Sequence, residues 1–288
     1  MKYKFLYFLG LIMITSIMVS CSDETTGSSE SGADPNLQES LMKLITVRDD
    51  GKISLSIDAP TEARESIWID LNADGKRAVD GSEDVRIYNA YEEYTFSENI
   101  KEIVIHGNIT YLGCASNMLT GLDVTANPYL TTLNCPHNKL SGIDISKNRS
   151  LQRLDCSENE ISSLNLSANV ALLSLWCYHN KLESLNVSSN TNLAALDCSD
   201  NTLTALDVTN NSFLERLLCY NNNLTSLDIS KNEKLNRLWI YGNRLSDNEI
   251  QKISIALNDV TRGDLWLSDN QILNELQTKL SAKGWTVR

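Results

Sequence analysis

Six of the seven cysteines in the chain recur at one interval of 21 residues. They are Cys114, Cys135, Cys156, Cys177, Cys198 and Cys219. Regularly spaced thiols can ligate a metal ion, form disulfide bonds or pack as small apolar side chains. Which of these applies depends on how the chain positions each thiol relative to the next.

The interval belongs to an internal repeat that begins near Leu112. Each 21-residue unit has two similar halves of the pattern L-x-x-L-x-[C/V/I]-x-x-N, as in LTTLNCPHN followed by LSGIDISKN. Apolar and polar residues alternate over a short segment that ends at asparagine, which predicts a short strand followed by a turn. Units of this length bury a continuous core only by stacking on one another, so the sequence predicts a solenoid.

An aliphatic residue occupies the cysteine position in the other half of each unit. The residues are Val124, Ile145, Leu166, Val187, Val208 and Ile229, and the seventh unit has Ile240 in the cysteine position itself. Stacked strands place equivalent Cβ atoms about 4.8 Å apart, beyond the roughly 3.5–4.5 Å of a disulfide, and a linear column does not converge on a metal ion. We therefore expect structural core thiols.

The repeats resemble the leucine-rich repeat proteins, specifically the short internalin-like repeats of bacterial surface proteins. The resemblance covers about residues 100–288. It implies a β-rich leucine-rich repeat solenoid of short parallel strands. It also implies a protein ligand, often in adhesion.

Both ends of such a stack require a cap, and the sequence supplies candidates. We expect repeats over residues 101–245 and a last long repeat with a helical cap over 246–288, including one helix within residues 246–260 and a second over 271–282. In the first of these helices Ile250, Ile253 and Ile255 are apolar at helical spacing. Residues 41–100 alternate as short antiparallel strands, which predicts a small β-sandwich-like domain that docks on the solenoid.

The N-terminus has the pattern of an export signal. Residues 1–20 form a basic tip and an apolar run that is short for a membrane span of about 20 residues. The Ser-Cys ending resembles the lipobox of bacterial lipoproteins, which implies a lipid on Cys21; an uncleaved anchor is the alternative. Residues 21–40 are polar and acidic, which indicates a flexible tether. We expect an outer-membrane lipoprotein, exposed at the cell surface and attached to the membrane only through its lipid.

The segment DLNADGKRAVDGSE is a candidate metal site. Asp70, Asn72 and Asp74 match the first half of a calcium loop, in which three oxygens converge. The bidentate acid expected at the twelfth position is a glycine, with Asp80 and Glu83 on either side. The same residues suit a hairpin turn rich in Asp and Gly. We expect the turn, with calcium as the alternative.

The outward-facing residues of the cysteine-bearing strands change along the stack from polar to aromatic. The candidate ligand-binding residues are Trp176, Tyr178, Arg216, Leu218, Tyr220, Arg237, Trp239, Tyr241 and Trp266. Clustered Trp, Tyr and Arg side chains are typical of binding hot spots, and large exposed apolar patches usually mark a partner.

Three hypotheses account for this face. A protein ligand is the first, in line with the resemblance, and it should engage Arg216 and Arg237 in a salt-sensitive way. A glycan or captured nutrient is the second, because Trp and Tyr rings stack on sugars. The third is self-association or coverage by the C-terminal cap, which would make the chain a structural component of the envelope.

Composition argues against two other classes of function. The net charge is −12 and no basic stripe is present, so we expect no nucleic-acid partner. His106, His137 and His179 are the candidate general bases, and the sequence assigns no carboxylate or thiolate partner to the last two. No glycine-rich phosphate loop is present. We therefore expect no enzyme activity.

Overall fold

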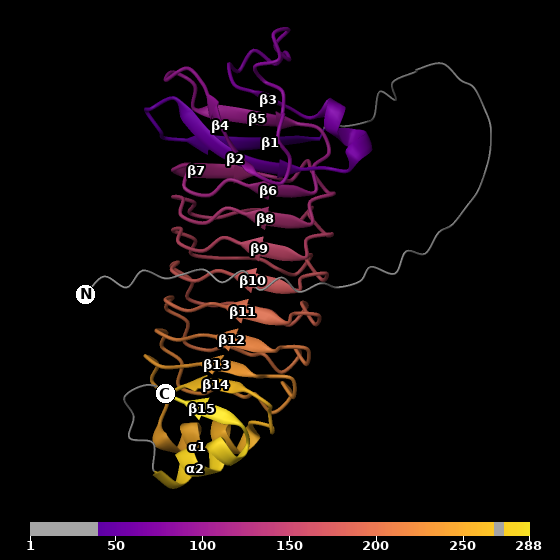
Figure 1. The fold of residues 1–288 in the computed structure, drawn as a ribbon. Helices are drawn as coiled ribbons and strands as arrows, with labels where there is room; N and C mark the ends of the chain where they lie inside the picture. Colours follow the sequence, from indigo (N-terminus) through magenta and orange to yellow (C-terminus); the bar gives the residue numbers. More distant parts are fainter. Residues whose placement is uncertain (1–39, 268–273) are drawn as a thin grey trace, which may run out of the picture. The chain divides into compact units, whose positions relative to one another are not determined.

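One parallel strand of three residues per unit forms the centre of the fold (Figure 1). The computed structural model describes residues 40–267 and 274–288. The strands are β6 (Tyr111–Gly113), β8 (Thr132–Asn134), β9 (Arg153–Asp155), β10 (Ser174–Trp176), β11 (Ala195–Asp197), β12 (Arg216–Leu218) and β13 (Arg237–Trp239). They pair in chain order, so the middle leucine of each strand lies beside the middle leucine of the next. This confirms the predicted leucine-rich repeat solenoid.

A cysteine follows six of these strands and lies in the core. All six repeat cysteines are free, and each is 0% exposed. Burial raises the pKa of every one of these thiols, to about 12 for Cys114. The thiols are therefore core side chains held in the unreactive protonated form, as predicted.

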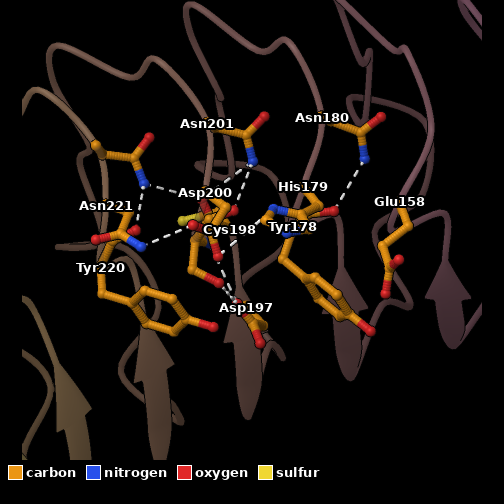
Figure 2. Close-up of polar contacts among 12 residues, drawn as sticks. Glu158, Tyr178, His179, Asn180, Asp197, Cys198, Asp200, Asn201, Tyr220 and Asn221 are labelled. Atoms are coloured by element: carbon orange, nitrogen blue, oxygen red, sulfur yellow. Dashed lines mark hydrogen bonds and ion pairs between the residues drawn. The ribbon is translucent and has the colours of Figure 1, made fainter. Parts of the chain in front are cut away.

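An asparagine in each turn ties neighbouring units together (Figure 2). Asn201 Nδ2 donates to the carbonyl oxygens of Cys177, Cys198 and Ser199 at 3.0, 3.2 and 3.0 Å. Its Oδ1 accepts from the backbone N–H of Leu182 at 2.9 Å. Equivalent bonds are made by Asn138, Asn159, Asn180, Asn222 and Asn243. This ladder satisfies backbone groups that a buried turn would otherwise leave unpaired.

Replacement of Asn201 by alanine tests the energetic weight of the ladder. Asn201→Ala leaves the Leu182 backbone N–H without its partner and removes one of two donors from each of three carbonyl oxygens, so we expect the free energy of unfolding to fall by about 1–3 kcal/mol. Asn192→Ala is the matched control, because the exposed Asn192 makes one hydrogen bond of 3.5 Å. Urea unfolding measures both. Equal losses in the two variants would contradict the role assigned to the ladder.

An antiparallel assembly closes the N-terminal end of the stack. Its elements are β1 (Leu41–Thr46), β2 (Lys52–Asp58), η1 (Thr61–Ser66), β3 (Trp68–Asp70), β4 (Tyr91–Thr95), β5 (Glu102–His106) and β7 (Leu119–Asp123). β2 pairs with β6 on one side and with β4 on the other, which extends the parallel sheet. β1 lies between β5 and β7 in a second, four-stranded sheet, and β3 pairs with β5. The structure therefore confirms the predicted antiparallel sheet at the N-terminus, and Gln38–Arg288 forms one compact unit.

Helices and two further strands close the C-terminal end (Figure 1). They are α1 (Asp247–Ala256), β14 (Gly263–Trp266), α2 (Asn274–Ala282) and β15 (Trp285–Val287). α1 begins after Ser246, whose side chain accepts a hydrogen bond from the Glu249 backbone N–H at 3.3 Å and so caps the helix. β14 and β15 continue the parallel sheet. Within the described residues, no helix is long and apolar enough to cross a membrane.

The residues predicted to form the buried face of the first helix are buried, except for Ile255. Ile250 and Ile253 are 4% and 1% exposed, whereas Ile255 is 70% exposed and Ser254 takes the buried position instead. The Ser254 hydroxyl donates to the carbonyl oxygen of Ile250 at 2.7 Å, which satisfies it inside the core. Of the second predicted helix, residues 271–273 lie outside the described residues.

Candidate binding surface

One row of side chains runs along the exposed face of the parallel sheet. The last residue of each strand from β8 to β14 occupies this row. In order the residues are Asn134, Asp155, Trp176, Asp197, Leu218, Trp239 and Trp266. Each is the register partner of the next, and all are partly buried. The row is therefore a linear array in which neighbouring side chains lie about 4.8 Å apart at the backbone.

Four rings at the C-terminal end of this face pack against one another. We call Tyr220, Trp239, Tyr241 and Trp266 the aromatic cluster. Tyr220 and Tyr241 are stacked with centroids 4.5 Å apart. Trp266 lies 4.5 Å from Tyr241 and meets Trp239 edge-on at 5.4 Å. Such pairs add about 0.5–1.5 kcal/mol each beyond their buried area, so the cluster is a rigid apolar surface that stays partly exposed.

Arginines edge the aromatic cluster on neighbouring strands. Arg237 Nε lies 3.5 Å from Asp264 Oδ2, and its guanidinium lies 5.8 Å from the Trp239 ring centroid. Trp239 Nε1 donates to the same Asp264 oxygen at 3.1 Å. Arg216 forms no ion pair with any described residue; burial and then the Arg237 charge lower its pKa. Arg216 is thus a cation on this face that is open to a ligand. Asp264, which fixes Arg237, was not predicted as a site residue.

The predicted ligand-binding residues lie in two groups along the stack. Trp176 and Tyr178 belong to the β10 repeat, and β11 separates them from the aromatic cluster. Leu218 lies in the row between β11 and Trp239 and is partly buried. Figure 2 shows Tyr178 and Tyr220 on either side of Asp197, the last residue of β11.

Asp197 was not predicted as a site residue, although it lies at the centre of the row. Its Oδ1 accepts from the Ser199 backbone N–H at 3.1 Å and from Ser199 Oγ at 2.6 Å. Burial raises the pKa of Asp197 to about 6; the Ser199 hydrogen bonds oppose this shift, and the charges of Asp200 and Asp155 add to it. Burial also raises the pKa of Asp155, which makes the same contacts with Ser157. The row therefore holds two carboxylates whose ionised form is disfavoured.

The raised pKa of Asp197 predicts a pH-dependent gain in stability for Asp197→Asn. Because the folded pKa of about 6 exceeds the usual 3.8, ionisation destabilises wild type as pH rises from about 4 to about 6. The variant keeps the acceptor for Ser199 and loses the charge. We expect its free energy of unfolding to equal that of wild type near pH 4 and to exceed it by about 2 kcal/mol above pH 6.

Asp207→Asn is the control for this measurement. Asp207 is exposed, and hydrogen bonds from Thr209 lower its pKa. Its replacement removes no disfavoured charge, so no gain should appear. Urea unfolding at several pH values compares the variants. A gain for Asp197→Asn that is unchanged at pH 4 would contradict the assignment to ionisation.

The surface histidines have carboxylate partners that sequence reasoning missed. His137 Nδ1 lies 2.7 Å from Glu158 Oε2, and His179 Nδ1 lies 3.6 Å from Asp200 Oδ2. All four residues occupy the same turn position in successive units and have φ between 51° and 55°. The expectation that these histidines lack carboxylate partners is therefore wrong, because each partner lies 21 residues along the chain. The 21-residue repeat interval is the signal in the sequence that could have identified these carboxylate partners.

The candidate calcium segment is a turn closed by backbone hydrogen bonds. Glu83 accepts from the N–H groups of Leu71 at 3.0 Å and Ala78 at 2.8 Å, and Asp70 accepts from Gly75 at 3.0 Å. Glu83 and Asp70 are 2% and 4% exposed. The remaining candidates are exposed and accept from the N–H two residues on: Asn72, Asp74 and Asp80. In residues 40–267 and 274–288, no group of three His, Cys, Asp or Glu side chains is placed to hold a metal ion.

Replacement of Glu83 separates the turn from the calcium alternative. In Glu83→Gln an amide nitrogen replaces one oxygen and faces a backbone N–H, so we expect a loss of about 1–3 kcal/mol in the free energy of unfolding. Asp80→Asn keeps its exposed acceptor and should lose little. Thermal unfolding with and without millimolar calcium measures both effects. A wild-type midpoint that rises with calcium would favour the metal site over the turn.

Solved structures place the fold among internalin-like leucine-rich repeats. The functional domain of InlJ from Listeria monocytogenes, described as including a cysteine ladder, is 38% identical with a TM-score of 0.53, over 62% of this chain and 38% of that chain. An internalin (inlF) from Listeria monocytogenes str. 4b F2365 is 22% identical with a TM-score of 0.50, over 57% of this chain and 50% of that chain. No family model and no curated protein matches. The fold is internalin-like. The match covers half or less of these neighbours.

Proposed function

We propose that the chain is a non-catalytic recognition protein that binds a protein ligand across the face formed by β10 to β14. The aromatic cluster carries this proposal. Its rings are held against one another on hydrogen-bonded strands, yet they stay partly exposed beside Arg216. Trp, Tyr and Arg dominate the energetics of protein interfaces, and side chains that are already ordered lose little entropy on binding.

The proposal includes attachment at the cell envelope. Residues 1–20 are the signal peptide, Cys21 carries the lipid and the remainder of 21–40 is the tether; residues 1–39 lie outside the described residues. The Ser-Cys ending after a short apolar run supports this assignment. A surface-exposed lipoprotein with an apolar binding face suits adhesion to a host or partner protein.

A binding comparison tests the aromatic cluster. The chain from Gln38 to Arg288 and its Trp239→Ala/Tyr241→Ala variant are examined by sedimentation and then passed over arrays of extracellular proteins and glycans. We expect a monomer that captures a protein, with at least a tenfold loss of affinity in the variant and weaker capture at high salt. Tyr129→Ala/Phe213→Ala is the matched control, because these rings are exposed by 56% and 48% elsewhere in the repeats and should not matter.

Two other outcomes would contradict a protein ligand. Capture of glycans alone, dependent on the two rings and insensitive to salt, would make the chain a glycan-binding protein. Dimerisation that is lost in the variant, with nothing captured on the arrays, would make the aromatic cluster an assembly surface.

A further inference from the structure

Positive charge is concentrated at one place on the sheet face. The residue two positions before each member of the row forms a second outward-facing column. In order these residues are Thr132, Arg153, Ser174, Ala195, Arg216, Arg237 and Asp264. Arg216 and Arg237 are the only two cations that are neighbours in this column. They lie side by side on β12 and β13, beside the aromatic cluster.

A single carboxylate serves the arginines at the C-terminal end of the column. Arg237 Nε lies 3.5 Å from one oxygen of Asp264, and Arg288 Nε lies 3.6 Å from the other. Both distances exceed the usual N–H···O hydrogen bond of about 2.7–3.2 Å. Among the described residues, Arg237 Nε has no hydrogen-bond partner. Because Trp239 also donates to Asp264, this carboxylate is already shared by three groups and none of them is Arg216.

Arg216 has no anion of its own in the unbound protein. Its side chain is exposed, and its guanidinium forms no hydrogen bond or ion pair with any described residue. Asp197 and Glu215 attract it only from a distance, whereas the neighbouring Arg237 repels it. An anion brought by a ligand would therefore relieve the repulsion between the two arginines and pair with both.

An apolar strip borders the two arginines on the same strands. Leu218 and Trp239 follow Arg216 and Arg237 by two residues, so they point to the same side of the sheet and stay partly exposed. Outward side chains two residues apart are separated by about 6.7 Å, twice the rise per residue of a strand. An extended ligand segment presents its own residues i and i+2 at this interval. Such a segment can place one acid on the arginines and one apolar side chain on the strip.

The acid-recognition site consists of Arg216, Leu218, Arg237 and Trp239. We infer that this site receives an extended segment of the protein ligand in which an acidic and an apolar residue are two positions apart. The aspartate or glutamate accepts hydrogen bonds from both guanidinium groups, whose planar donors suit a carboxylate. The apolar residue packs on the adjoining strip. This inference rests on the proposed function and names the chemistry of the ligand.

Charge favours this ligand over the alternatives at this end of the face. A basic segment would be repelled by both arginines. A neutral sugar would stack on the aromatic cluster but would supply no charge for Arg216. The net charge of −12 disfavours a partner that is acidic throughout. The ligand is therefore a protein that carries its acid in a short local segment.

Peptides of equal length test the chemistry of the site. Each has Gly-Ser sequences on both sides of X-Gly-Trp, in which X is glutamate, glutamine or lysine. Binding to the chain from Gln38 to Arg288 is followed by NMR titration. We expect saturable binding of the glutamate peptide with a shift of the Trp239 indole signal, at least fivefold weaker binding of the glutamine peptide and weaker binding still of the lysine peptide. A glutamate peptide with its tryptophan adjacent to the acid should bind at least threefold more weakly, because the two side chains then point to opposite sides.

Charge reversal at two positions of one column gives the matched comparison. Arg216→Glu should lower the affinity for the glutamate peptide at least tenfold and make the lysine peptide the better ligand. Arg153→Glu is the control, because Arg153 is exposed in the same column between Thr132 and Ser174 and its reversal changes the net charge equally. It should leave the order of the peptides unchanged. Arg216→Lys keeps the charge without the planar donors and should retain part of the affinity.

Three results would overturn the acid-recognition site. Equal binding of the glutamate and glutamine peptides would make the contact apolar only. Equal losses in Arg216→Glu and Arg153→Glu would reduce the effect to net charge. Absence of saturable binding of the glutamate peptide would show that the site takes no such segment.

Failure of the acid-recognition site is distinguishable from failure of the proposed function. If Trp239→Ala/Tyr241→Ala abolishes protein capture while Arg216→Glu does not, the binding face stands and the acid-recognition site is wrong. If neither variant changes protein capture, the proposed binding face itself is wrong.

Discussion

The asparagine ladder is the interaction on which the rest of the fold depends. Each unit ends in a buried turn whose carbonyl oxygens point along the stack, and the amide of the next unit, 21 residues on, reaches back to them. A unit that lost this contact would leave polar backbone groups in the core. The ladder therefore favours a constant length of 21 residues in the units that carry it, whereas the last unit, whose strand β14 still pairs with β13, is longer. The ladder also explains why both ends need a cap, since the outermost unit has no neighbour.

The same constraint determines what the surface can be. Because equivalent residues lie side by side, the exposed face is a set of columns, and its properties follow from which residues are adjacent in a column. Rings in successive units give the packed pair Tyr220 and Tyr241. Ser199, which lies between Tyr178 and Tyr220 in its column, is fully buried, and an acid on each side of Trp176 gives an acidic stretch. Function can thus change along the stack while the leucine and cysteine columns beneath stay the same.

The periodicity of the sequence predicted which side chains form the core, but it did not predict which surface side chains contact one another. The 21-residue interval placed the cysteines in the core, because Val and Ile share their position, and the row containing Trp239 followed from the same alternation. The interval does not reveal which rotamer a surface side chain adopts. Asp264, which binds Arg237, lies in the longer last unit, outside the strict repeat. The predicted burial of Ile255 was wrong for a similar reason. Apolar spacing cannot show that the neighbouring Ser254 satisfies its hydroxyl within the helix and therefore takes the buried position.

The position of Asp197 in the stack determines how much its unfavourable charge destabilises the protein. In a solenoid each unit interacts mainly with its two neighbours, so an unfavourable charge acts on the local interfaces and not on the whole chain. β11 lies between β10 and β12, away from both caps, and intact ladder contacts on each side hold its turn closed. The same carboxylate in a terminal unit would favour fraying, because one of those interfaces would be missing. A central unit is therefore where the fold best tolerates an acid whose ionised form is disfavoured.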